Sequence, residues 1–260
     1  MKKILFLSLL FYQLTAQAQL VTSFKGEVKY KNKTIRAGER LPNDAKIALE
    51  KNAILVFRKQ NGNFVLENKN AQTKEFLLTD AKPANKINME GNRDINTDFH
   101  NLPQLRSYFY HQEQKTMLLV GENTFALNDK RFPLNDQTNF YLFPQGVENT
   151  QKGILLPKKN GRFVINAEIL AQKNIQAFQV NSFQLIYEDK DAKLSLMTNC
   201  KLIFADKTEV LQTIQTIFED MKNQQGEDIL TICLETLENV YGKPDSYFVR
   251  KTLIDLGAKF

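Results

Sequence analysis

Residues 24–66 read FKGEVKYKNKTIRAGERLPNDAKIALEKNAILVFRKQNGNFVL, and their apolar residues recur with the period of β-strands. From Phe24 to Tyr30 apolar and charged residues alternate, which is typical of one half-buried strand. Residues 53–57 form an uninterrupted apolar run of strand length, which favours a strand buried on both faces. Asn32 tolerates a left-handed backbone, and Asn61-Gly62 is a strong hairpin signal.

These patterns predict a small all-β module of about five strands over residues 19–66. Alternation places one set of apolar side chains on the inner faces of these strands. The predicted core consists of Val28, Tyr30, Ile35, Leu41, Ile47, Leu55, Phe57, Phe64 and Leu66.

The order of glycines and apolar residues in this module resembles the FecR-type β module of bacterial envelope proteins. The resemblance is carried by Gly26-Glu27-Val28, Ile35-x-x-Gly38-x-x-Leu41, Ala45-Lys46-Ile47, residues 53–57 and Phe64-Val65-Leu66. FecR proteins are membrane-spanning signalling regulators. No segment after the N-terminus approaches the ~18 apolar residues of a membrane span, so we predict no transmembrane segment in the mature chain. The resemblance therefore implies the architecture of the module and not the signalling role.

The N-terminus has the three parts of a secretory signal peptide. Lys2 and Lys3 are followed by a largely apolar stretch from residue 4 to 14 and by Ala16-Gln17-Ala18, a small-x-small cleavage site. We predict that residues 1–18 are removed and that the protein is exported to the periplasm or the cell exterior. The alternative is a buried N-terminal helix or strand. Export makes nucleic acid an unsuitable partner.

The module is strongly basic. From residue 19 to 66 ten Lys and Arg residues stand against four Asp and Glu residues, a net charge of +6, whereas the rest of the chain after residue 18 has a net charge of −2. Lys25, Lys29, Lys31 and Lys33 fall at even spacing, which predicts a basic face for an anionic partner, either an envelope protein or an anionic surface such as lipid headgroups. The alternative is that these lysines form solvated strand faces and protect edges from pairing.

The rest of the chain predicts an α+β protein with segregated elements. Residues 67–98 are polar, contain Pro83 and Gly91, and are predicted to be a connection. Residues 99–260 predict a β-rich body closed by C-terminal helices from about residue 206. Predicted strands cover 116–120, 124–127, 130–134, 140–143, 153–156, 162–165, 183–188, 194–197 and 201–204, and helices begin at Asp206, Glu227 and Pro244.

Three later segments carry a second resemblance, to a family of uncharacterised exported proteins of Gram-negative bacteria. They are Gly161-Arg162-Phe163-Val164-Ile165, Leu202-Ile203-Phe204-Ala205-Asp206 and Val240-Tyr241-Gly242-Lys243-Pro244-Asp245. Proteins of this family join a FecR-like N-terminus to such a C-terminal part, and caspase-like proteins often accompany them. The resemblance implies an envelope protein and a caspase-like partner.

Residues with catalytic potential are few. The two histidines, His100 and His111, lie in no recognisable nucleophile context. Residues 94–98 have the D-x-N-x-D spacing of a calcium loop, but Phe99 and Leu105 occupy the positions that need Gly and a bidentate acid. We therefore predict no metal site, no cofactor and no catalytic residue.

Cys200 and Cys233 are the only cysteines. We expect two buried thiols, and the alternative in an exported protein is a disulfide between them. Taken together, the sequence predicts an exported, non-enzymatic binding or scaffold module for another envelope component. The alternative is a periplasmic hydrolase acting on glycan or peptide, because the sequence does not exclude a catalytic pair of carboxylates.

The signal-peptide prediction has a direct test. N-terminal sequencing of the protein from envelope fractions is expected to begin at Gln19 or within about two residues of it, because signal peptidase cleaves after a small-x-small site. An intact Met1 in those fractions would contradict the prediction.

Overall fold

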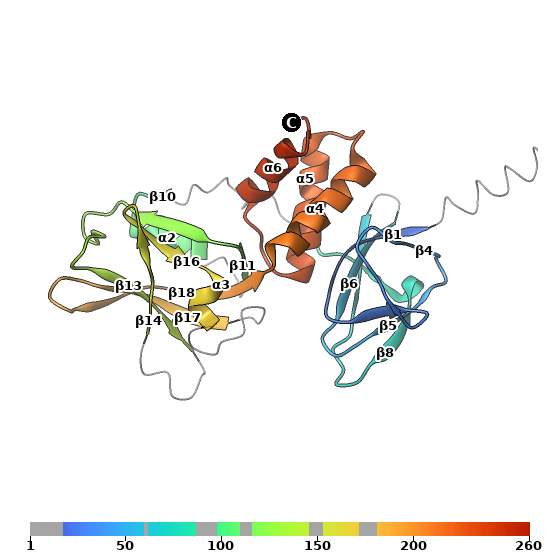
Figure 1. Ribbon diagram of the computed structural model, residues 1–260, viewed down its shortest axis with the longest axis horizontal. Helices are drawn as coiled ribbons and strands as arrows, with labels where there is room; N and C mark the ends of the chain where they lie inside the picture. Colours follow the sequence, from blue (N-terminus) through green and yellow to red (C-terminus); the bar gives the residue numbers. More distant parts are fainter. Residues whose placement is uncertain (1–17, 60–61, 87–97, 110–115, 146–152, 172–180) are drawn as a thin grey trace, which may run out of the picture. The chain divides into compact units, whose positions relative to one another are not determined.

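The computed structural model describes residues 18–59, 62–86, 98–109, 116–145, 153–171 and 181–260 (Figure 1). The chain is α+β, as predicted, and divides into two compact units. Among the described residues the first unit comprises 18–86, 212–240 and 252–260, and the second comprises 98–211 and 241–251. Residues 1–17 of the predicted signal peptide lie outside the described residues.

Two antiparallel sheets form the β part of the first unit, with strand orders β4-β1-β6-β7-β9 and β3-β2-β5-β8. The strands are β1 (Gln19–Lys25), β2 (Val28–Tyr30), β3 (Lys33–Thr34), β4 (Arg40–Leu41), β5 (Lys46–Leu49), β6 (Ile54–Lys59), β7 (Gly62–Glu67), β8 (Lys74–Leu77) and β9 (Lys82–Pro83), with a 3-10 turn, η1 (Leu78–Asp80), before β9. Both sheets contribute to one core. It contains all nine predicted core residues, seven of them buried and two, Tyr30 and Phe64, partly buried against the others.

The single strand predicted from Phe24 to Tyr30 was wrong, because the chain forms two strands there, β1 and β2, in different sheets. Gly26 separates them with a φ of 77°, and a Cβ at this position would lie 3.1 Å from the Cα of Ala53. A residue without a side chain is needed for this turn, since L-residues rarely adopt positive φ. The module also extends past residue 66, because β8 and β9 arise from the predicted connection. Gly62 begins β7, whereas Asn61 lies outside the described residues.

The sheet β4-β1-β6-β7-β9 is covered on its outer face by residues of α4 (Lys207–Met221) and by α5 (Gly226–Val240). The Oγ1 of Thr213 donates to the Oγ of Ser23 at 3.2 Å, and the Nδ2 of Asn63 donates to the Oγ1 of Thr236 at 3.2 Å. Four consecutive residues of β6, from Leu55 to Arg58, are buried. The prediction that this strand is buried on both faces is therefore confirmed.

One ion-pair cluster connects this sheet to α4. The guanidinium of Arg58 on β6 is 9% exposed, and its Nη1 lies 3.3 Å from the Oδ2 of Asp220. The Nη2 of Arg40 on β4 donates to the Oδ1 of the same carboxylate at 2.9 Å. A buried charge is tolerated only when it is paired, so Asp220 is the group that permits Arg58 at the inner face of the helix layer.

The C-terminal residues complete the first unit. The backbone N–H of Gly226, at the start of α5, donates to the carbonyl of Lys259 at 2.8 Å. A Cβ on Gly226 would lie 2.6 Å from that oxygen, so glycine is required for the close approach.

The second unit has sheets of order β10-β12-β16-β15 and β11-β18-β17-β13-β14. Pairs β10–β12 and β11–β18 are parallel, and the other neighbours are antiparallel. The elements are β10 (Asp98–Phe99), α2 (Leu102–Phe109), β11 (Met117–Val120), β12 (Asn123–Leu127), β13 (Asn139–Pro144), β14 (Ile154–Leu155), β15 (Lys158–Lys159), β16 (Arg162–Ile165), α3 (Ala167–Ala171), β17 (Asn181–Glu188) and β18 (Leu194–Ala205), and α6 (Ser246–Asp255) begins in this unit.

Aromatic rings from both sheets fill the core of the second unit. The centroids of Phe140 and Phe163, on β13 and β16, lie 4.4 Å apart, and Phe125 packs against Phe163 at 5.5 Å. The buried rings include Phe99, Tyr108, Phe109, Phe125, Phe140, Phe163, Phe183, Tyr187 and Phe204.

Two strand predictions in this unit were wrong. Residues 130–134 form no strand, because the side chain of Asp129 accepts the backbone N–H of Arg131 and turns the chain. The two strands predicted at 194–197 and 201–204 are one strand, β18. The three helices begin within about two residues of their predicted starts. The N-cap at Asp206 is confirmed, since its Oδ1 accepts the N–H of Thr208 at 2.7 Å and that of Glu209 at 3.2 Å.

The ion pair of Arg58 predicts a large effect of its partner on stability. Asp220→Ala is expected to lower the free energy of unfolding by about 3 kcal/mol, because it leaves a buried guanidinium without its carboxylate. Urea unfolding followed by circular dichroism measures this as a lower midpoint. Glu219→Ala, which removes the exposed neighbouring carboxylate, is the matched control and is expected to change the midpoint little. Equal midpoints for the two variants would contradict the prediction.

Candidate interaction surface

The hairpin between β2 and β3 presents two of the four predicted binding lysines. Lys31 and Asn32 form its loop with φ angles of 49° and 62°, the two positive values of a type I′ turn, which confirms the turn predicted at Asn32. Lys31 and Lys33 are exposed, and within the described residues neither contacts a carboxylate. The Nζ of Lys31 lies 5.1 Å from the centroid of the Tyr30 ring. The hairpin therefore carries two available positive charges at the edge of its sheet.

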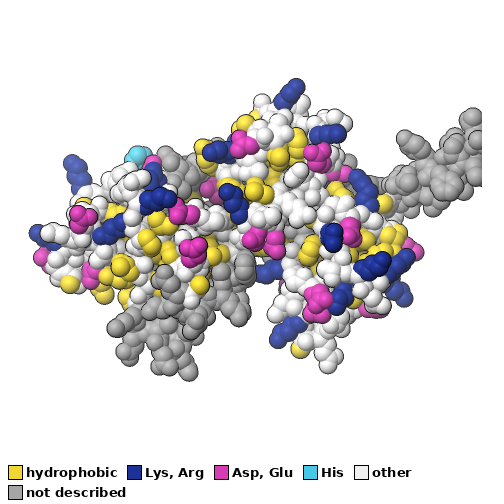
Figure 2. Space-filling model, in the orientation of Figure 1, with side chains coloured by type: hydrophobic (Ala, Val, Ile, Leu, Met, Phe, Trp, Pro, Cys, Tyr) yellow, Lys and Arg dark blue, Asp and Glu magenta, His cyan; other side chains and the backbone are white. Residues whose placement is uncertain are grey.

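The other two predicted lysines have different surroundings. Lys29 forms an ion pair with Glu27 and lies 3.8 Å from Glu50, and its hydrogen bond to Glu27 raises the pKa of the ammonium. Lys25 ends β1, in the other sheet, where burial lowers the pKa of its ammonium. The structure thus places Lys31 and Lys33 on one hairpin, neutralises Lys29 locally and separates Lys25 by the turn at Gly26. Figure 2 shows basic and acidic side chains interspersed over the β module.

A second feature of the first unit is a groove of about 640 Å³ beside β8 and β9. Most of its lining residues lie in the segment 67–98, which the sequence predicts to be a connection, so they were missed as candidates. The short apolar run from Phe76 to Leu78 is a weak signal for β8, because it is too short to define a strand by its period. Its lining residues are Ile54, Val65, Leu66, Glu67, Lys69, Asn70, Lys74, Phe76, Asp80, Lys82, Pro83, Asn85, Glu238 and Asn239.

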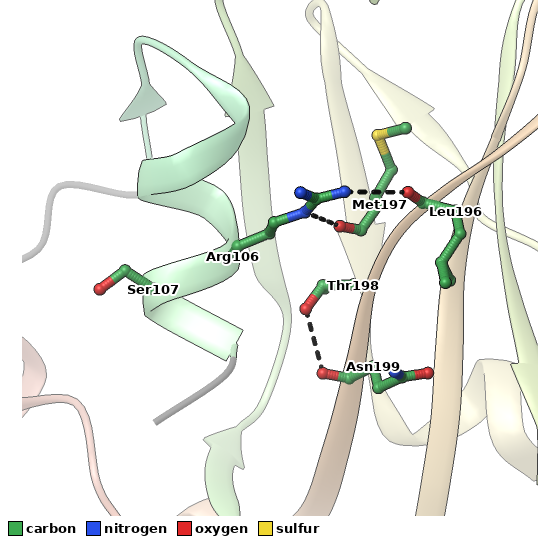
Figure 3. A pocket seen from close by; sticks show the side chains of 6 residues that line it. All are labelled: Arg106, Ser107, Leu196, Met197, Thr198 and Asn199. Carbon is green, nitrogen blue, oxygen red and sulfur yellow. Dashed lines mark hydrogen bonds between the residues drawn. The ribbon is translucent and has the colours of Figure 1, made fainter. Parts of the chain in front are cut away.

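A smaller cavity of about 310 Å³ lies between α2 and β18 in the second unit (Figure 3). Arg106 extends from α2, and its Nε donates to the carbonyl of Met197 at 2.7 Å and its Nη2 to that of Leu196 at 3.4 Å. Met197 is the extra residue of a β-bulge, since Leu196 and Thr198 pair with consecutive residues of β17. Arg106 therefore satisfies carbonyls at an irregularity of the sheet, and this role accounts for its position without a ligand.

Both cysteines are free and buried. Cys200 lies on β18 in the second unit and Cys233 on α5 in the first. Burial raises the pKa of the Cys200 thiol to about 12 and raises that of Cys233 as well, although Arg58 partly opposes the second shift. The thiolate is the reactive form of cysteine, so neither thiol is suited to nucleophilic catalysis at neutral pH.

The remaining residues considered from the sequence are dispersed. His100 is exposed in the loop before α2, and His111 lies outside the described residues. Asp98 forms an ion pair with Arg162, whereas residues 94–97 of the D-x-N-x-D segment lie outside the described residues. Where the structure describes the chain, no three His, Cys, Asp or Glu side chains come together as metal ligands.

Comparison of the chain with protein-family models, with curated proteins and with solved structures found no match. None of the helices in the described ranges is both long and apolar enough to cross a lipid bilayer.

Because both cysteines are free and buried, the structure predicts the result of thiol counting. Two free thiols per chain are expected after denaturation without reductant, and the folded protein is expected to react slowly, because burial keeps both thiols protonated. Cys200→Ser and Cys233→Ser are each expected to leave one reactive thiol. A count of zero in the denatured wild-type protein would demonstrate a disulfide and contradict the prediction.

Proposed function

We propose that this protein is an exported, non-enzymatic binding protein of the bacterial envelope, and that its β module contacts an anionic partner. The hairpin of β2 and β3 is the observation that carries this proposal. It presents Lys31 in its loop and Lys33 on the short edge strand β3, and neither contacts a carboxylate among the described residues. Surface charge that the protein does not neutralise itself is available to attract a partner of opposite sign.

The surroundings of the lysines indicate how the partner is recognised. Lys29 is paired with acidic neighbours, so its contribution to the field outside the molecule is small. Lys31 and Lys33 are exposed, and exposed charges are screened over about 8 Å at physiological ionic strength. Binding through them is therefore expected to be weak per residue, to depend on both together and to decrease as salt concentration rises.

The sequence resemblance extends the proposal to the kind of protein. A FecR-like module on an exported chain fits a role as a scaffold for another envelope component. The caspase-like proteins implied by the resemblance are candidates for that component, as acidic surfaces on them would complement the hairpin.

Charge reversal at the hairpin tests the proposal. The variant Lys31→Glu with Lys33→Glu is expected to sediment with isolated envelopes at least about tenfold less than wild type at low salt, because two attractive charges become repulsive. The matched control is Lys46→Glu with Lys51→Glu, which makes the same charge change at exposed residues elsewhere in the module. Circular dichroism is expected to show unchanged folding in both variants.

The comparison of the two variants decides the outcome. If both lose association equally, total charge and not the hairpin is responsible. If neither loses it, the lysines serve only to keep an edge strand from pairing. Vesicles containing phosphatidylglycerol, tested beside protease-treated envelopes, distinguish lipid headgroups from an acidic protein.

A further inference from the structure

The groove beside β8 lies next to a strand edge with free main-chain groups. β8 is the last strand of its sheet and pairs only with β5 in the described part of the chain. The N–H of Leu78 donates to the carbonyl of Ala45 at 3.1 Å, which fixes the hydrogen-bonded positions of this antiparallel pair. Lys74 and Phe76 accordingly direct their main-chain groups to β5, and Glu75 directs its N–H and C=O to the free edge.

The residues near Glu75 and on β7 differ in whether their main-chain groups are free to form hydrogen bonds. The N–H of Leu77 is already occupied, because it donates to the Oδ2 of Asp80 at 3.0 Å. On β7 the N–H of Asn68 donates to the carbonyl of Ala53 at 3.0 Å, so Asn68 faces β6. Because the main-chain groups of successive residues point in opposite directions, those of Glu67 point away from β6. β9 pairs with β7 only at Phe64 and Val65, so no β9 residue is registered opposite Glu67.

The side chains beside this edge form the groove. Lys74 and Phe76 are two residues apart on β8, so they point to the same side, and both line the groove. Half-buried Ile54 and Val65 supply apolar surface to it from β6 and β7. A strand added to the edge of β8 would direct alternate side chains over this surface.

The lysines and acids that line the groove differ in their contacts. Glu67 is paired with Lys69 at 3.2 Å, Asp80 accepts from Leu77, and Glu238 is engaged in an interaction. Lys74 and Lys82 are exposed, and among the described residues neither contacts a carboxylate. Glu67 and Lys69 thus neutralise each other, whereas the ammonium groups of Lys74 on β8 and Lys82 on β9 contact no carboxylate in the described ranges and can attract negative charge.

We propose that this groove binds an extended, acidic peptide segment of the partner protein, which adds as a strand to the edge of β8. The peptide main chain pairs at Glu75, its apolar side chains lie over Phe76, and its carboxylates contact Lys74 and Lys82. The proposal rests on the proposed binding function and names the class of partner. The main-chain pairing favours a peptide over an anionic polysaccharide or a lipid, because only a peptide extends the hydrogen-bond ladder of the sheet.

The test uses the full mature chain and a fluorescent peptide of about eight alternating Glu and Val residues, an extended length of roughly 26 Å. Fluorescence polarisation measures binding. The same peptide N-methylated at alternate residues removes main-chain donors, and an alternating Lys and Val peptide reverses the charge. Only the unmodified acidic peptide is expected to bind, and hydrogen exchange at Glu75 is expected to slow when it does.

Two double variants locate the site. Lys74→Glu with Lys82→Glu is expected to weaken binding at least about tenfold. The matched control Lys46→Glu with Lys51→Glu, at exposed residues outside the groove, is expected to retain it within about twofold. Asn70→Asp, which adds a carboxylate to the groove lining without removing a lysine, is expected to give an intermediate loss.

The outcomes separate this proposal from the proposed function. Equal binding of the N-methylated peptide, or displacement by dextran sulfate without protection at Glu75, shows a general polyanion surface and overturns it. No binding of the acidic peptide also overturns it and leaves Lys74 and Lys82 as residues that keep the edge from pairing. Envelope association that depends on Lys31 and Lys33 but not on the groove lysines supports the proposed function alone.

Discussion

A guanidinium enclosed by protein has to be neutralised where it lies, and Arg58 imposes this constraint on the first unit. Its strand is covered on both faces, so solvent does not stabilise the charge. The carboxylate that does so comes from α4 and is also bound by Arg40, 180 residues away in sequence from Asp220. This shared carboxylate therefore connects α4 to two strands of the sheet, β4 and β6.

Other polar contacts lie between the same sheet and the helices that cover it. Ser23 with Thr213 and Asn63 with Thr236 also join the sheet to α4 and α5. These two hydrogen bonds favour one placement of the helices, because a buried hydroxyl or amide is stabilised only where its partner lies within reach. The outer face of the sheet therefore adds side-chain hydrogen bonds to its contact with these helices, whereas the inner face, with Leu55 and Phe57, packs by shape and apolar area.

The sequence predicted what depends on local pattern. Alternation identified the module core and helical periodicity identified the C-terminal helices, because burial on one face leaves a regular signal. The boundary between β1 and β2 was missed, since the turn at Gly26 interrupts neither the charge nor the apolar alternation. The pairing of Arg58 with Asp220 has no sequence signal, because it depends on which helix covers which strand.

The sequence predicted only part of the candidate surface, because the rest depends on contacts between strands and not on local pattern. Even spacing placed four lysines on one face, but spacing does not show which of them has an acidic neighbour across the sheet. Lys29 lies near Glu50, which follows the neighbouring strand β5, and is also paired with Glu27 two residues before it, whereas Lys31 contacts no carboxylate among the described residues. The edge of β8 was missed because a strand of four residues in polar surroundings has too little pattern to be recognised.

The first unit is built from three separate stretches of the chain, and this arrangement sets the order in which the protein can assemble. Residues 19–67 contain most of the strands, but the partners of Arg58 and Asn63 lie beyond residue 212, and the start of α5 is held by Lys259. A chain that emerges from its N-terminus through a ribosome or a translocation channel exposes these strands long before the helices that cover them arrive. The segment made first is therefore completed last. Loss of a few C-terminal residues would remove the contact of Lys259 with the start of α5 and would thereby weaken the helix layer over the N-terminal strands. Completion of the β module therefore requires the whole chain.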